Sequence, residues 1–173
     1  MTLNKHIRDI PNFPKKGILF KDITPLLKNK KAFSKVIDLF NERHKKNKID
    51  KIVGIEARGF IFGASLAIRM GCGFVPIRKP NKLPYQKYSY EYTLEYGKDK
   101  LEVHKDALNS GENILLIDDV LATGGTACAA IKLIEKFNCN LIECLFVLEI
   151  SGLKGEKRVL NKNKSLFSLI KSN

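Results

Sequence analysis

Apolar positions along the chain follow two different spacings, and each spacing predicts one kind of element. A three-to-four-residue spacing is typical of a helix with one buried face. It runs through residues 32–46, at Phe33, Val36, Ile37, Leu39 and Phe40. Similar helical patterns occupy residues 61–70 and 127–137. These three segments are predicted helices.

Short runs of β-branched and other apolar residues stand between the helical segments and predict strands. They are KIVGI, GFVPI, NILLI and LIECLFVLEI, at residues 51–55, 73–77, 113–117 and 141–150. The tail SLFSLI, at 165–170, predicts one more edge strand. Strands that alternate with helices favour an α/β fold with a mostly parallel, twisted sheet flanked by helices.

The chain of 173 residues fits a single domain, residues 1–173, with two irregular segments. Residues 1–30 are interrupted by three prolines and Gly17, and they predict a small N-terminal hood in which GILFKDI is extended. Residues 79–97 are rich in lysine, tyrosine and proline, and they predict a flexible loop or arm. The second half of that arm, YSYEYTLEY, alternates weakly in the manner of a strand.

Ligands of parallel α/β sheets bind at the carboxyl ends of the strands. Three loops of this sequence follow predicted strands at that edge: EARGF at 56–60, RKPNKLP at 78–84 and DDVLATGGT at 118–126. We therefore expect the functional site to be built from these three loops.

The third loop contains the ingredients of a phosphate site. Gly124 and Gly125 permit positive φ angles and close approach of the backbone, and a predicted helix follows directly. The free N–H groups of that helix, with the hydroxyls of Thr123 and Thr126, can hold a phosphate. Neither a Walker A loop nor a GxGxxG motif is present. The alternative is a tight turn with Thr126 as the N-cap of the helix.

Asp118 and Asp119 precede that loop, and two carboxylates repel an anion unless something lies between them. Ribose hydroxyls could donate hydrogen bonds to the carboxylates, and a divalent cation could bridge a carboxylate and the anion. The loop therefore predicts a ribose 5-phosphate, with Mg²⁺ near Asp118 and Asp119. The cation would be held mainly through the ligand rather than by direct protein ligands.

Composition excludes several other kinds of protein. The four cysteines form no CxxC pair and the three histidines are scattered, so neither a zinc site nor a disulfide framework is expected. No apolar run reaches the roughly 20 residues of a membrane span, and the N-terminus lacks the apolar core of a secretory signal. We therefore expect a cytoplasmic protein that does not bind membranes.

The net charge of +13 comes from 31 Lys and Arg against 18 Asp and Glu. The excess is mostly lysine spread over the whole chain, without the interleaved aromatic residues of a surface that stacks bases. We expect no specific nucleic-acid partner, although the charge would attract a small polyanionic substrate.

The string LLIDDVLATGGT closely resembles the motif with which type I phosphoribosyltransferases bind 5-phosphoribosyl diphosphate (PRPP). Four further stretches resemble the adenine phosphoribosyltransferase family, in the same order along the chain. They are FPKKGILFKDITPLL, GIEARGFIFG, IRKPNKLP and LEYGKDKLEVHKDAL. The resemblance extends over roughly residues 10–169. It implies the type I phosphoribosyltransferase fold, a homodimer, use of Mg²⁺, and the purine salvage reaction of adenine with PRPP to AMP and pyrophosphate.

The resemblance also implies roles for individual residues. The ribose-5-phosphate group would be held by Asp118, Asp119, Ala122, Thr123, Gly124, Gly125 and Thr126. Pyrophosphate would be held by Glu56, Ala57, Arg58, Arg78, Lys79 and Lys82. Adenine would be bound by Leu19, Phe20, Lys21 and Leu153, with Phe20 stacked on the ring and main chain at Leu19 and Lys21 reading its amino edge. Catalysis would rest on Glu95, Arg58 and Lys82, with Glu95 as proton acceptor or relay.

Each of these residues also has a simpler structural interpretation. Arg58 could form a surface ion pair with Glu56, the cations of residues 78–82 could be a solvated charge run, and Phe20 could belong to the core. Two positions depart from the family: Lys21 stands where arginine is common, and Asn81 replaces a glycine that would leave the loop more flexible.

Two other functions remain open from the sequence. One is a phosphoribosyltransferase for another purine such as xanthine, because the PRPP motif sees only ribose and phosphates. The other is a regulator that senses PRPP and binds DNA, which the basic charge would suit.

Overall fold

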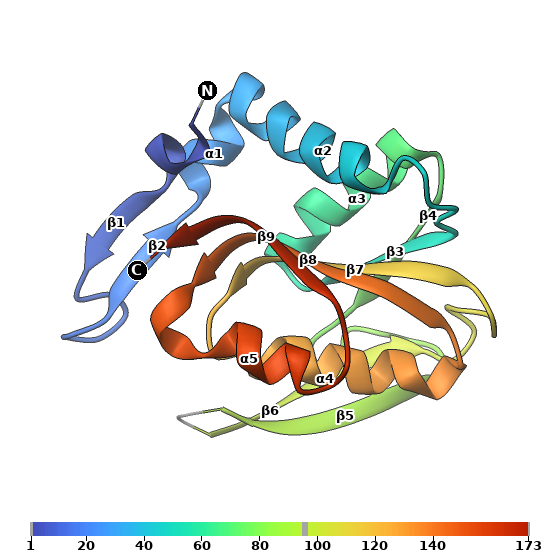
Figure 1. Cartoon of the computed structure of the whole chain (residues 1–173). Coiled ribbons are helices and arrows are strands. Elements are labelled where there is room, and N and C mark those ends of the chain that lie inside the picture. The colour runs from blue at the N-terminus through green and yellow to red at the C-terminus, as the bar shows by residue number, and fades with distance from the viewer. Residues whose placement is uncertain (1, 95–96, 173) are drawn as a thin grey trace.

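A parallel sheet of five strands forms the centre of the molecule (Figure 1). The computed structural model describes residues 2–94 and 97–172. The strand order is β4 (Gly73–Ile77), β3 (Lys51–Ile55), β7 (Asn113–Leu121), β8 (Asn140–Ile150) and β9 (Leu166–Ser172). All four pairings between neighbours are parallel. The predicted α/β sheet and its additional edge strand are thus confirmed.

Helices cover both faces of the sheet (Figure 1). On one face lie α1 (Thr24–Lys28), α2 (Lys30–His44) and α3 (Arg58–Met70). On the other lie α4 (Gly125–Ile134), α5 (Gly155–Leu160) and the antiparallel hairpin of β5 (Lys87–Leu94) and β6 (Gly97–His104). Short 3₁₀ turns stand at η1 (Leu3–His6), η2 (Glu135–Phe137) and η3 (Ser151–Leu153). No helix in the described ranges has the length and apolar character needed to cross a bilayer.

Strand β7 divides the core in two because successive side chains of a strand point to opposite faces. Ile114 and Leu116 belong to the cluster beneath α4 and the β5–β6 hairpin. Leu115 and Ile117 belong to the cluster beneath α2 and α3. A strand that is buried on both faces in this way has the continuous apolar run seen in NILLI.

The N-terminal segment forms a small antiparallel hairpin of β1 (Arg8–Pro11) and β2 (Leu19–Asp22). Asp22 fixes the junction between this hairpin and α1. Its carboxylate accepts a hydrogen bond from the Thr24 backbone N–H at 2.9 Å and forms an ion pair with Arg8 at 2.6 Å. The hairpin stands beside the carboxyl end of β9 (Figure 1).

Several boundaries differ from the predicted ones. Strand β7 continues to Leu121, because β8 is long enough to pair with it as far as Glu149, so Asp118 and Asp119 lie within the strand. Helix α3 begins at Arg58 rather than Ile61, since the glycine that follows Arg58 permits close packing of the first turn.

The predicted helix over residues 127–137 occupies 125–134 instead, and its last residues form a 3₁₀ turn. The weakly alternating segment is a strand over 87–94. Its partner β6 and the short helix α5 were not predicted.

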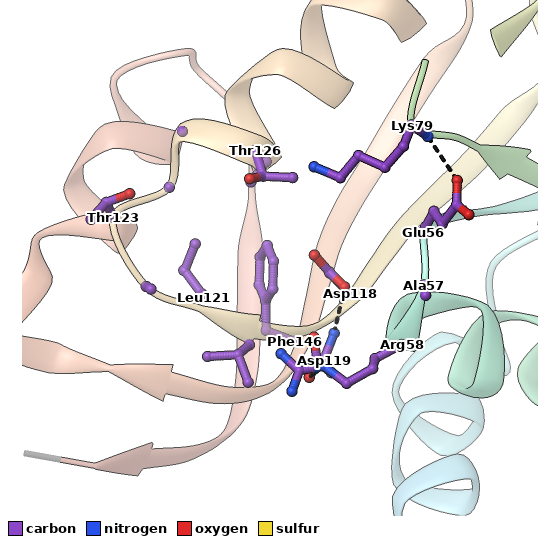
Figure 2. Close-up of a pocket in the computed structure, with 15 residues that line it drawn as sticks. Glu56, Ala57, Arg58, Lys79, Asp118, Asp119, Leu121, Thr123, Thr126 and Phe146 are labelled. Atoms are coloured by element: carbon purple, nitrogen blue, oxygen red, sulfur yellow. Dashed lines mark hydrogen bonds and ion pairs between the residues drawn. The ribbon is translucent and has the colours of Figure 1, made fainter. Parts of the chain in front are cut away.

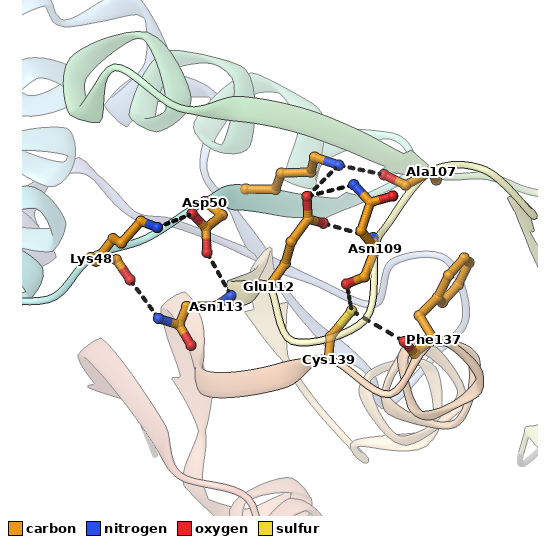
Figure 3. Close-up of polar contacts among 9 residues, drawn as sticks. Lys48, Asp50, Ala107, Asn109, Glu112, Asn113, Phe137 and Cys139 are labelled. Carbon is orange, nitrogen blue, oxygen red and sulfur yellow. Dashed lines mark hydrogen bonds and ion pairs between the residues drawn. The ribbon is translucent and has the colours of Figure 1, made fainter.

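A polar network fixes the opposite, amino edge of the sheet (Figure 3). The Lys51 ammonium lies 3.0 Å from the Glu112 carboxylate, which also accepts a hydrogen bond from the Asn109 backbone at 2.8 Å. Asp50 accepts a hydrogen bond from the Asn113 backbone at 2.9 Å. These contacts anchor the starts of β3 and β7, whose carboxyl ends carry the candidate site.

Candidate functional site

A pocket of about 320 Å³ opens at the carboxyl edge of the sheet, where β3, β4 and β7 end (Figure 2). It is lined by Glu56, Ala57, Arg58, Lys79, Asp118, Asp119, Val120, Leu121, Ala122, Thr123, Gly124, Gly125, Thr126, Ala127 and Phe146. The strand order places β3 between β4 and β7, so the three predicted loops meet here.

Residues 122–126, the phosphate loop, join β7 to α4. Gly124 has φ = 77° and is the N-cap of α4, a conformation that favours glycine. Gly124 is the N-cap and no side-chain hydrogen bond caps this helix, so the alternative that Thr126 serves as N-cap is wrong. The first-turn N–H groups of α4 therefore lack a side-chain acceptor. These N–H groups can donate hydrogen bonds to an anion, and the partial positive charge of the helix N-terminus attracts it. This end of the pocket therefore suits a phosphate.

Asp118 and Asp119 line the pocket from the second half of β7, and Asp119 lies beside Arg58 (Figure 2). The Asp118 carboxylate accepts a hydrogen bond from the Asp119 backbone N–H at 2.9 Å, and the Arg58 Nε lies 2.7 Å from Asp119 Oδ2. Burial, and then the charge of Asp119, raise the pKa of Asp118 well above its usual value. Burial also raises the pKa of Asp119, and Arg58 opposes that rise. Two buried acids in contact favour a ligand that brings hydroxyl donors or a cation.

Gly59 allows the first turn of α3 to lie against these acids. A Cβ at this position would stand 2.9 Å from both Asp118 Oδ1 and the Ile117 carbonyl oxygen. The Gly59 backbone thus brings Arg58 to the Asp119 carboxylate.

Glu56 organises the start of the second loop rather than pairing with Arg58. Its carboxylate accepts hydrogen bonds from Arg78 Nη2 at 3.0 Å and from the Lys79 backbone N–H at 2.7 Å. Burial pushes the pKa of Glu56 upward, but these donors outweigh it and the net shift is downward. The alternative of an Arg58–Glu56 surface pair is therefore wrong, since Arg58 pairs with Asp119.

The cations of the second loop separate into two groups. Lys79 lines the pocket, and its side chain extends toward Thr126 (Figure 2). Arg78 and Lys82 are not among the lining residues: Arg78 is held by Glu56, and its Nη1 donates to the Lys82 carbonyl at 3.2 Å.

Asn81 has φ = 64°, the left-handed region, which asparagine tolerates better than most residues do. Asn81 therefore adopts the backbone conformation that the family's glycine would favour at this position.

The four residues expected at adenine lie around the pocket rather than in its lining. Phe20, on β2, has the Arg58 guanidinium 5.7 Å above its ring. Leu153, on η3, is exposed and shares a second cavity of about 460 Å³ with Thr123. Leu19 is 45% exposed, whereas the Lys21 side chain is buried with its ammonium 2.9 Å from Asp9.

Glu95, expected to handle the purine proton, lies outside the described residues. Some lining residues were not predicted: Val120, Leu121, Ala127 and Phe146. Phe146 reaches the pocket because the register of β7 and β8 pairs it with Asp118. In the sequence, the long apolar run of β8 was the only signal for this position.

The donor set fits Mg²⁺ held largely by a ligand. No group of three or more metal-binding side chains occurs within residues 2–94 and 97–172. The pocket nevertheless presents two adjacent carboxylates, and the pKa of each is raised by burial. Mg²⁺ commonly binds one or two carboxylates together with phosphate oxygens and water, so two acids suffice.

Comparisons with known proteins cover nearly the whole chain. Residues 22–173 match the family described as phosphoribosyl transferase domain. The adenine phosphoribosyltransferase of Acaryochloris marina is 53% identical over 92% of this chain and 94% of its own length.

Solved structures of adenine phosphoribosyltransferases share the fold. The adenine phosphoribosyltransferase of Thermoanaerobacter pseudethanolicus has 49% identity and a TM-score of 0.93, with 98% of each chain covered. The Saccharomyces cerevisiae enzyme, complexed with adenine and an imino-altritol bisphosphate, has 44% identity and a TM-score of 0.90, with 96% of each chain covered.

Proposed function

The chain belongs to the adenine phosphoribosyltransferase family, and we propose that its carboxyl-edge pocket transfers the 5-phosphoribosyl group of PRPP to adenine. The products are AMP and pyrophosphate, so the reaction is a purine salvage step. The observation that carries the proposal is one pocket that combines two buried acids, an uncapped helix N-terminus and a lysine.

PRPP fits this arrangement from end to end. The 5-phosphate would accept hydrogen bonds from the phosphate loop and the Thr123 and Thr126 hydroxyls. The ribose hydroxyls would donate to Asp118 and Asp119, which are adjacent and lie in the same pocket. The diphosphate would then extend toward Arg58 and Lys79 on the side of β3 and β4.

Bond breaking at C1 of the ribose needs stabilisation of the departing charge. The purine nitrogen attacks C1, the bond from C1 to the diphosphate oxygen breaks, and its electron pair leaves with pyrophosphate. Arg58 and Lys79 are cations held in position before substrate arrives, by Asp119 and by the β5–β6 hairpin. Such preorganised charges stabilise a leaving group most effectively. Arg78 and Lys82, from the loop that follows β4, would join them, and Glu95 would receive the purine proton.

Adenine would stack on Phe20, with Leu153 at the opposite face of the ring. Strand β2 pairs with β1 on one side, and no second strand partner of β2 occurs in the described residues. Backbone groups at Leu19 and Lys21 would read the amino edge of the base. This reading would not use the Lys21 ammonium, which pairs with Asp9.

Mg²⁺ is proposed as the cofactor, near Asp118 and Asp119. When bound with PRPP it would supply positive charge against the phosphates. The chain's own part is to present two carboxylates and to keep the rest of the pocket free of competing acids, apart from Glu56, which Arg78 neutralises.

The two rival functions receive less support. The relatives named above are all adenine phosphoribosyltransferases, which favours adenine over xanthine. The family match over residues 22–173 is to the phosphoribosyl transferase domain, which favours the enzyme over a DNA-binding regulator.

We also propose a cytoplasmic homodimer. Helix α3 presents Ile61 and Ile68, which are 41% and 84% exposed and lie seven residues apart on one face. A second copy of the chain would bury them. All four cysteines are free thiols, which suits a reducing compartment.

The assay that tests the proposal follows AMP and pyrophosphate formation from adenine and PRPP. Asp119→Asn should lower kcat/KM for PRPP about 10- to 150-fold, because charge-assisted hydrogen bonds contribute roughly 1.5–3 kcal/mol. Asp106→Asn makes the same chemical change at an exposed position outside the pocket and should change nothing. Equal activity of both variants would refute the assignment.

Metal dependence is a separate expectation. Excess EDTA should abolish turnover, and added Mg²⁺ should restore it, because the paired acids and the polyanionic substrate need a shared cation. Full activity in metal-free buffer would rule out Mg²⁺ as the cofactor.

A further inference from the structure

The β5–β6 hairpin carries two polar residues that meet the pocket from outside its lining. Tyr92 and Asp99 stand directly opposite each other in the antiparallel register. Tyr92 is 8% exposed, packed with the core cluster beneath α4. The Asp99 side chain is 24% exposed. Tyr92 lies in none of the stretches that resemble the family, and Asp99 lies in one of them, LEYGKDKLEVHKDAL, without a role assigned from it.

Hydrogen bonds connect these two residues to both sides of the pocket. The Tyr92 hydroxyl donates to Asp99 Oδ2 at 3.0 Å, and Asp99 also forms a short ion pair with the Lys79 ammonium. The same hydroxyl lies 3.3 Å from Thr126 Oγ1 and 3.4 Å from Lys79 Nζ. Lys79 follows β4 and Thr126 begins α4, so one Tyr–Asp pair bridges two distant loops.

Hydrogen bonds and opposite charges keep both partners of this bridge ionised, against the effect of burial. Burial raises the pKa of Asp99, but the hydrogen bonds from Lys79, the Lys100 backbone and Tyr92 lower it overall. Burial would lower the pKa of Lys79, and Asp99 reverses that effect, so the ammonium stays charged.

The bridge has a consequence for ligand binding. Lys79 has a long flexible side chain, and ordering such a side chain when a ligand binds costs affinity. In this protein the ammonium is already fixed, at a set separation from the phosphate loop. The Tyr92 hydroxyl contacts both Lys79 Nζ and Thr126 Oγ1, so it links the two groups that would meet different phosphates of PRPP.

We propose that Tyr92 and Asp99 are positioning residues for PRPP, which hold the Lys79 ammonium and the Thr126 hydroxyl at the spacing required by its diphosphate and 5-phosphate groups. The inference rests on the proposed function, because it takes PRPP as the ligand. It adds two residues that contact the substrate-binding groups rather than the substrate.

The same hairpin offers a matched control. Glu91 pairs with Lys98 at 2.9 Å, and both side chains are more than half exposed. Glu91→Gln removes a hairpin carboxylate and its ion pair, as Asp99→Asn does, but it leaves Lys79 and Thr126 untouched.

The experiment compares Asp99→Asn, Tyr92→Phe and Glu91→Gln with the unaltered protein. PRPP affinity is measured by calorimetry with Mg²⁺, and KM is measured for PRPP and adenine separately. Asp99→Asn should weaken PRPP binding about 10-fold and Tyr92→Phe about 5-fold, as expected for loss of a charged and a neutral hydrogen bond. The KM for adenine should stay within about twofold in both variants, and Glu91→Gln should match the unaltered protein. Tyr92→Phe keeps the ring in the core, so it retains the hairpin even if Asp99→Asn does not fold.

Two results would overturn the inference. One is unchanged PRPP affinity in Tyr92→Phe and in Asp99→Asn. The other is a parallel rise of the KM for PRPP and for adenine together with a lower Tm, which would mean a purely structural role. The outcome is separable from the proposed function: if the unaltered protein binds PRPP but makes no AMP, the function fails while the affinities still decide the roles of Tyr92 and Asp99.

Discussion

Gly155 leaves no room for a side chain between α5 and the phosphate loop. A Cβ at this position would overlap the Ala122 carbonyl oxygen and stand 3.0 Å from the Leu121 side chain. On the other side of the contact, a Cβ on Gly124 would lie 3.0 Å from the Gly155 carbonyl oxygen. Two backbone segments therefore pack directly on each other, and the shape of the phosphate loop depends on this contact.

We predict that Gly155→Ala raises the KM for PRPP about 10-fold or more. Overpacking of this kind costs roughly 1–3 kcal/mol, and displacement of the Ala122 carbonyl would shift the donors that hold the phosphate. Steady-state kinetics with varied PRPP measure the effect. Gly152→Ala is the control, because a Cβ at that position meets nothing within 4 Å. Identical KM values for the two variants would contradict the role of the Gly155 contact.

At the scale of elements, α2 is tied to the sheet by a buried polar network. The Glu143 carboxylate on β8 accepts hydrogen bonds from Arg43 Nε at 2.6 Å and from Ser165 at 3.0 Å, and it lies 3.1 Å from His44 Nε2. The Arg43 guanidinium also stacks 3.9 Å above the Phe167 ring on β9. Burial pushes the pKa of Glu143 upward, but the hydrogen bonds outweigh it and lower the pKa to about 2.

This lowered pKa predicts an acid-sensitive contribution to stability. A carboxyl whose folded pKa lies below its unfolded value of 4.5 stabilises the protein fully above pH 4.5 and loses that contribution as pH falls toward 2. The contribution is roughly 3 kcal/mol at neutral pH. Glu143→Gln should lower the free energy of unfolding by about that amount and flatten its pH dependence between pH 4.5 and 2.

Denaturant unfolding at several pH values measures both effects. Glu42→Gln removes an exposed ion pair with Lys45 on the same helix and should leave the unfolding curve nearly unchanged. A Glu143→Gln variant that keeps the pH dependence of the unaltered protein would show that another group is responsible.

Sequence patterns predicted the elements better than their ends. The strands at 51–55 and 73–77 are confirmed to the residue, because both are short apolar runs bounded by polar or glycine positions. Asp118 and Asp119 were placed in a loop, since charge normally ends a buried strand; only pairing with β8 explains why β7 continues. The Tyr92–Asp99 bridge also depends on strand register and on a contact between the β5–β6 hairpin and the start of α4, which no local pattern contains.

At the scale of the whole molecule, the net charge of +13 suits a substrate with several negative charges. Many cations are already neutralised within the structure, for example Lys51 by Glu112 and Lys87 by Glu102. The absence of a specific nucleic-acid partner stays a prediction. The apolar exposure on α3 is a second whole-molecule feature, and α3 begins at Arg58 in the pocket.

We predict that the protein is a dimer in solution and that Ile68→Lys shifts it toward the monomer. Ile68 is 84% exposed, and a lysine there would place a desolvated charge in the proposed interface. Sedimentation velocity at several concentrations measures the mass. Leu160→Lys, at an exposed apolar position on α5, is the control. A monomer of the unaltered protein at micromolar concentration would contradict the proposed interface.

The central claim is that this pocket joins PRPP to adenine, and the ratio of kcat/KM for adenine to that for hypoxanthine tests it most directly. Hypoxanthine exchanges the 6-amino donor for a carbonyl acceptor and carries a proton on N1. Backbone groups at Leu19 and Lys21 that suit adenine would be left buried and unpaired by hypoxanthine, and sites of this kind discriminate by around 10⁴. The account predicts AMP as the product and a ratio of about that size, largely retained in Lys21→Ala because the Lys21 ammonium pairs with Asp9. Comparable use of both bases, or a preference for hypoxanthine, guanine or xanthine, would contradict it.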